Sequence, residues 1–107
     1  MTVLVLRSLG AFAASLGATT ITAFPTDKIR ALLLYLALEN EQPHPRERLA
    51  ALFWPGIAQT NALNNLRVTL HRLCETLDKV QPALSAALVE RTRQTIQLNP
   101  ALITTDV

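Results

Sequence analysis

The chain has few of the residues that build covalent, metal and phosphate-loop chemistry. A single cysteine among 107 residues excludes an internal disulfide and a cysteine-rich zinc site, and it is typical of a reducing compartment. Three glycines provide no glycine-rich loop that could hold a nucleotide phosphate. No histidine or cysteine set has metal-ligand spacing, and no nucleophile has an evident base beside it. We therefore expect no enzymatic activity, no metal and no cofactor.

A long apolar run is also absent. Residues 2–6 are apolar, but Arg7, Gly10 and Gly17 interrupt any signal-peptide core or membrane span. We therefore expect a cytoplasmic protein without membrane contact. Half of the residues are apolar, which allows a single compact domain to bury a core without disulfides.

The chain also lacks a strong excess of charge of either sign, and the distribution of its charged residues is more informative than its net charge. Ten Lys and Arg residues stand against eight Asp and Glu residues, which gives a net charge of +2 and a pI near 9.2. This weak bias permits a nucleic-acid partner without requiring one. The basic excess lies in residues 67–93, where three acids stand against Arg67, Arg72, Lys79, Arg91 and Arg93.

Proline, glycine and apolar spacing predict the order of elements. Leucine-rich and β-branched segments predict a small antiparallel N-terminal sheet, with strands over residues 2–7, 12–15 and 19–23. Apolar spacing and breakers predict three helices, over residues 28–40, 46–54 and about 60–79. Residues 88–98 have the alternation of a β-hairpin with arginines at its tip, and a polar-ended tail follows Pro100.

The first two helices are expected to be mainly structural. Thr26 or Asp27 can cap the first helix. Arg46, Glu47 and Arg48 open the second helix on what we expect to be a solvated face, with contact of one of the two arginines to phosphate as the alternative. Trp54 is expected to anchor the end of this helix in the core. The apolar residues expected to be buried are Ile29, Leu32, Leu33 and Leu36 in the first helix, and Leu49, Leu52 and Phe53 in the second.

The third helix has two contrasting faces. Leu63, Leu66, Leu70, Leu73 and Leu77 are spaced 3, 4, 3 and 4 apart, so they form one apolar stripe that we expect in the core. Amides and guanidinium groups, which can bind base edges and phosphates, occur on the opposite side, although a merely solvated face is the alternative. The residues of that polar side are Asn61, Asn64, Asn65, Arg67, Val68, His71, Arg72 and Glu75.

Three helices followed by a hairpin with a basic tip are typical of a winged helix-turn-helix. In that fold the third helix enters the major groove, and wing arginines reach the adjacent minor groove or its phosphates. We therefore predict an α+β winged helix-turn-helix that binds double-stranded DNA. Asn64, Asn65, Val68 and His71 would face bases, whereas Arg67 and Arg72 would neutralise phosphates together with the wing arginines, Arg91 and Arg93.

The chain also resembles a known family over nearly its whole length. The segments KIRALLLYLALENEQPHPRERLAALFWP and NALNNLRVTLHRL are similar to the N-terminal DNA-binding domain of bacterial transcriptional activators of the SARP type, which is itself similar to OmpR/PhoB effector domains. The resemblance implies a four-stranded N-terminal sheet, a trihelical core and a C-terminal wing. It further implies binding to direct repeats and recruitment of RNA polymerase. A helical-repeat activator domain would follow this single domain, residues 1–107, in a longer protein.

One departure from the family pattern affects the end of the third helix. The family commonly reads Arg-Leu-Arg where this chain has Arg72, Leu73 and Cys74, and a basic residue is frequent where Glu75 stands. Fewer phosphate contacts would make DNA binding weaker and less dependent on salt. We expect Cys74 to be a partly buried, inert thiol.

Two other interpretations of the same residues lead to different functions. A protein-interaction module inside a larger signalling protein could use this fold without contacting DNA, and a contiguous exposed apolar patch would favour it. A coiled coil through the leucine stripe would require that stripe to be exposed, whereas the other helices need it as core.

Overall fold

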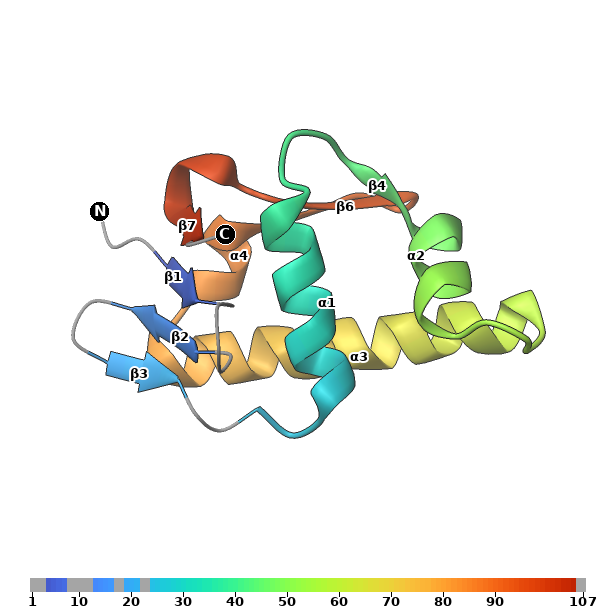
Figure 1. The fold of residues 1–107 in the computed structure, drawn as a ribbon, viewed down its shortest axis with the longest axis horizontal. Helices are drawn as coiled ribbons and strands as arrows, with labels where there is room; N and C mark the ends of the chain where they lie inside the picture. The colour runs from blue at the N-terminus through green and yellow to red at the C-terminus, as the bar shows by residue number, and fades with distance from the viewer. Residues whose placement is uncertain (1–3, 8–12, 17–18, 22–23, 106–107) are drawn as a thin grey trace.

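The computed structural model describes residues 4–7, 13–16, 19–21 and 24–105. Within these residues the chain is a mixed α+β structure with four α-helices and two small sheets (Figure 1). The α+β class matches the class that the order of elements predicts. The elements are β1 (Leu4–Arg7), β2 (Ala13–Leu16), β3 (Thr19–Ile21), α1 (Asp27–Leu38), β4 (His44–Pro45), α2 (Arg46–Phe53), α3 (Gln59–Val80), α4 (Leu84–Leu88), β5 (Val89–Arg91), β6 (Thr95–Leu98), a 3-10 turn (Pro100–Leu102) and β7 (Ile103–Thr105).

Helix α1 begins and packs as its sequence predicts. The Thr26 side chain caps it by accepting a hydrogen bond from the Ile29 N–H at 3.3 Å. All four residues of its predicted apolar face are buried. In Figure 1, α1 crosses the middle of α3, so the two apolar faces meet between them.

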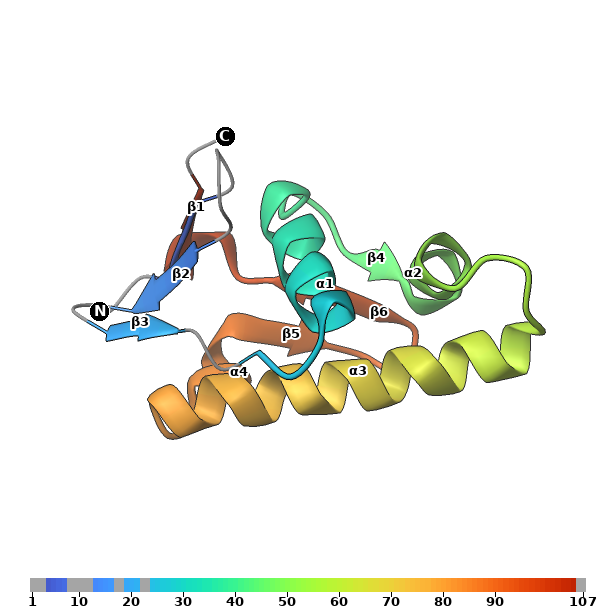
Figure 2. The same cartoon turned by 60° about the horizontal axis from the view of Figure 1, so that its bottom comes forward.

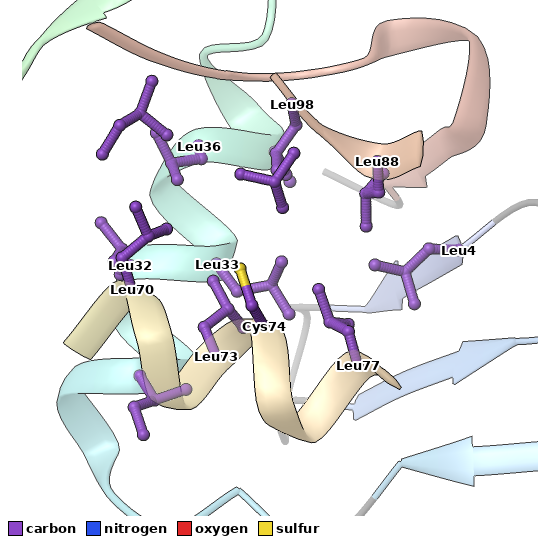
Figure 3. Close-up of a cluster of buried hydrophobic side chains, with 14 of the residues drawn as sticks. Leu4, Leu32, Leu33, Leu36, Leu70, Leu73, Cys74, Leu77, Leu88 and Leu98 are labelled. Atoms are coloured by element: carbon purple, nitrogen blue, oxygen red, sulfur yellow. The ribbon is translucent and has the colours of Figure 1, made fainter. Parts of the chain in front are cut away.

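Helix α3 is the longest element, and its leucine stripe is the centre of the core. Figure 3 shows Leu70, Leu73 and Leu77 on one side of α3, pointing toward the leucines of α1. Of the predicted stripe, Leu66, Leu70, Leu73 and Leu77 are buried, whereas Leu63 is half-buried against the same core. Because this stripe is covered by other elements, the coiled-coil interpretation is wrong.

Helix α2 is short and stops where breakers predict. It ends at Phe53. Gly56 follows with a φ of 80°, a backbone conformation that residues other than glycine rarely adopt. Trp54 is half-buried against the core, with the Lys28 Nζ atom 5.4 Å from its ring centre. The prediction for Leu52 is wrong, since this side chain is 52% exposed while Leu49 is buried.

The four-stranded sheet joins both ends of the described chain. Its order is β3-β2-β1-β7, with antiparallel pairs between the first three strands and a parallel pair between β1 and β7. Residues 2–3, 12 and 22–23 of the predicted strands lie outside the described residues. The three predicted strands pair antiparallel as expected. The prediction missed the fourth strand, because residues 103–105 pair in parallel with β1 where a polar tail was predicted. A parallel pair needs a long crossover, which here comprises most of the domain.

The three-stranded sheet brings the hairpin beside the helices. Its order is β4-β6-β5, and β4 lies between the first two predicted helices, where no strand was predicted. His44 within β4 is buried, and its Nε2 atom contacts the Glu39 carbonyl oxygen. Figure 2 shows β5 and β6 running along α3, with β4 close to α2.

The start of the hairpin differs from its prediction. Leu88 does not belong to a strand, because it is the last residue of α4, and β5 begins at Val89. Helix α4 follows a break at Pro82 and is held to the end of α3 by a carboxylate. Asp78 accepts hydrogen bonds from the Ser85 N–H and from the Ser85 hydroxyl, both at 2.8 Å.

Candidate nucleic-acid interface

The polar face of α3 is exposed as predicted, because burial of the leucine stripe turns the opposite side outward. Five of its seven predicted contact residues are exposed: Asn61, Asn64, Arg67, His71 and Arg72. Asn65 and Val68 are half-buried. The helix therefore presents amide and guanidinium groups along one continuous side.

An open concavity lies where three elements meet beside this face. It has a volume of about 450 Å³. Arg67 and His71 of α3 face it from one side, and Arg91 and Arg93 of the β5–β6 hairpin face it from the other. The remaining lining residues are Arg46, Leu70 and Thr92, so no carboxylate lines the concavity. Four guanidinium groups with no carboxylate among the lining residues make this part of the surface attractive to an anion.

The concavity does not gather every predicted residue. It brings Arg67 and His71 of α3 together with Arg91 and Arg93, which lie about twenty positions later in the sequence. Five further predicted residues lie on α3 outside the concavity: Asn61, Asn64, Asn65, Val68 and Arg72.

The four arginines differ in how they are engaged. The Arg46 Nε and Nη2 atoms donate to the Thr92 carbonyl oxygen at 3.1 and 2.9 Å. Arg91 reaches inward, with Nη1 3.5 Å from the Cys74 sulfur, and Arg67 donates to Asn64 Oδ1 at 2.9 Å. Arg93 makes no hydrogen bond or ion pair with any described residue, so its charge is available to a ligand.

Burial shifts the pKa of two residues in this region. Burial, and secondly the neighbouring Arg91, lower the pKa of Arg46 from its ordinary value. Burial raises the pKa of Cys74, and the Arg91 guanidinium and a hydrogen bond with Ser85 oppose part of that rise. Cys74 is buried more completely than the partial burial predicted for it, and its lack of reactivity stays a prediction.

One carboxylate interrupts the basic character of α3. Glu75 Oε1 lies 3.6 Å from His71 Nε2, and both side chains are exposed. A protonated His71 would therefore be shared between this carboxylate and any anion in the concavity.

Arg46 is the residue of this surface that sequence reasoning missed. It was assigned to a solvated helix face, yet it is half-buried and binds a turn that lies 46 positions further along the chain. The signal that the sequence offers is Pro45, which favours an extended backbone at His44 before it, so that Arg46 directly follows a short strand.

Comparison with known proteins adds no relative, because no family model, curated protein or solved structure matches the chain. In the part of the chain that the structure describes, no three His, Cys, Asp or Glu side chains are grouped to hold a metal ion. The helices described here include none with the length and apolar character needed to span a membrane.

Proposed function

We propose that this chain binds double-stranded DNA sequence-specifically as a winged helix-turn-helix domain. The observation that carries the proposal is the acid-free concavity, in which arginines of α2, α3 and the β5–β6 hairpin converge beside the exposed face of α3. In this assignment α3 is the recognition helix and the hairpin is the wing. The order of three helices, with β4 between the first two and a hairpin after the third, supports this assignment.

The proposed roles follow from side-chain chemistry. Asn61, Asn64 and Asn65 can each donate and accept at adenine edges, and Val68 can lie against a thymine methyl group. Arg67 would bind phosphate at the edge of the major groove. His71 was expected to face a base, but its place beside Arg67 in the concavity favours phosphate. Arg72 would contact a base or phosphate on the other flank of α3. Arg93 would reach the backbone or the adjacent minor groove, with Arg91 beside it.

The cellular role that fits best is activation of transcription in bacteria. The resemblance to SARP-type activators supports it and suggests direct-repeat operators and contact with RNA polymerase. In the longer protein a helical-repeat activator domain would follow.

Charge-matched variants test the proposed surface. A duplex enriched from a random pool is titrated with the wild-type chain and with Arg67→Gln, Arg93→Gln and Arg48→Gln. Arg48 is exposed on α2 and does not line the concavity, so its variant controls for the loss of one charge. We expect the first two variants to bind about tenfold more weakly, with the salt slope reduced by about 1 each. Equal affinity of all four proteins would show that the assigned surface is wrong.

A protein-interaction module is the second candidate, and one observation favours it. A concavity of about 490 Å³ lies at the junction of α2 and α3, lined by Trp54, Pro55 and Ile57 among others. Ile57 is 46% exposed. Negligible binding of any duplex at low salt would favour this candidate over DNA recognition.

A further inference from the structure

The turn between β5 and β6 is closed mainly by its own polar groups. The Thr92 N–H donates to the Thr95 carbonyl oxygen at 2.9 Å. The Thr92 hydroxyl oxygen accepts from the Gln94 N–H at 3.2 Å and from the Thr95 N–H at 2.9 Å. This network defines the shape of the turn, but it does not attach the turn to the rest of the molecule.

Arg46 makes that attachment through two carbonyl oxygens of the turn. Its side chain donates twice to Thr92 O, and its backbone N–H donates to Gln94 O at 2.8 Å. The residue before it, Pro45, pairs with Thr95 across the β4–β6 ladder. Arg46 is also the first residue of α2, which packs on α3 through buried Leu49 and Ala50. Arg46 thereby fixes the turn to the start of α2, which packs on α3.

We propose that Arg46 is a positioning residue, which holds the tip of the hairpin so that Arg93 faces the same ligand as α3. The consequence for DNA rests on the proposed function, whereas the attachment itself does not. With two of its N–H groups engaged by Thr92 O, Arg46 acts through the turn more than through its charge. This distinguishes it from Arg67 and Arg93, which act by contact.

Lysine cannot replace arginine in this role. A guanidinium donates from several nitrogens held in one plane, whereas an ammonium donates from one nitrogen at the end of a flexible side chain. Arg46→Lys therefore keeps the charge in the concavity and removes the two-donor geometry. If Arg46 merely neutralised phosphate, this variant would behave like the wild type.

The first arm of the test needs no DNA. Amide hydrogen exchange of Gln94 and Thr95 is measured by NMR in the wild-type chain, Arg46→Lys and Arg46→Gln, with Arg48→Lys and Arg48→Gln as matched controls on the same helix. We expect exchange at both amides to accelerate about tenfold or more in the Arg46 variants. Amides of the α3 core should keep wild-type rates, which separates local release of the turn from unfolding. Unchanged tip exchange in Arg46→Lys overturns the proposal.

The second arm measures coupling on an enriched duplex. Arg93→Gln is introduced into the wild type and into Arg46→Lys, and Arg67→Gln is introduced into the same two backgrounds. We expect Arg93→Gln to cost several-fold less affinity in the Arg46→Lys background, whereas the effect of Arg67→Gln stays nearly the same. Full additivity of Arg46→Lys with Arg93→Gln would contradict the link between tip position and ligand contact. If the wild type binds no duplex, the proposed function fails, while the exchange arm still decides the attachment.

Discussion

At the scale of single residues, burial determines what a substitution costs, and two leucines represent the extremes. Leu73 is completely buried at the centre of α3, whereas Leu52 on α2 is 52% exposed. We expect Leu73→Ala to lower the free energy of unfolding by about 2–5 kcal/mol because a cavity remains in the core. Leu52→Ala should change it by less than about 0.5 kcal/mol. Urea unfolding of both variants checks this contrast, and similar losses would contradict the packing described for the two helices.

Cys74 is expected to make the free energy of unfolding fall at alkaline pH. Its pKa is raised in the folded chain, so the buried thiol keeps its proton at a pH where the unfolded thiol, with a pKa of about 8.5, has lost it. The stability that the protonated, buried thiol contributes is fully present below the pKa of the unfolded thiol. It is lost as the pH rises through the pKa of the folded thiol, at no more than about 1.4 kcal/mol per pH unit. We expect the unfolding free energy of the wild type to fall more steeply above pH 8.5 than that of Cys74→Ala, as measured by urea titrations across about pH 7–10. Parallel curves would argue against burial of this thiol.

Single residues could be predicted where the burial pattern repeats. The stripe of α3 was predicted because its leucines recur over several turns, so each one confirms the phase of the others. Leu52 was misplaced because α2 has only eight residues, too few for a periodic pattern to separate its buried and exposed sides.

At the scale of elements, the short helix α4 depends on a carboxylate of its neighbour. Asp78 accepts two hydrogen bonds from Ser85, one from the backbone and one from the side chain. We expect Asp78→Ala to destabilise the chain by about 1–2 kcal/mol, because the two Ser85 donors lose their acceptor. Thermal unfolding checks this, with the exposed neighbour Lys79 as the matched site: Lys79→Ala should leave the midpoint nearly unchanged. An equally small effect of both substitutions would show that the Asp78 contact contributes nothing.

Two strands that were not predicted share a physical cause. The strands β4 and β7 have two and three residues, so neither contains enough alternation to show a period. Each exists because a distant segment pairs with it: β6 for β4, and β1 for β7. The long helices α1 and α3 were predictable because their signals are local. Pairing across the chain is not a local signal.

At the scale of the whole molecule, the basic surface is a product of the fold. Arg67 and Arg93 could be proposed as ligand contacts from helical spacing and from the tip of a hairpin, and they do lie around one concavity. Arg46 could not be found in this way, because its role depends on a turn that the β4–β6 pairing brings to it. Arginines from three elements thus form one surface only after folding.

The most direct test of the proposed DNA binding is the salt dependence of duplex binding by the wild-type chain. A random duplex pool is carried through selection, and the affinity of the enriched sequence and of an unrelated one is measured by fluorescence anisotropy at several salt concentrations. We predict enrichment of a defined motif, with affinity for it falling steeply with salt at a slope of about 0.9 per phosphate contacted. No enrichment, together with negligible binding of either duplex at low salt, would contradict DNA recognition by this chain.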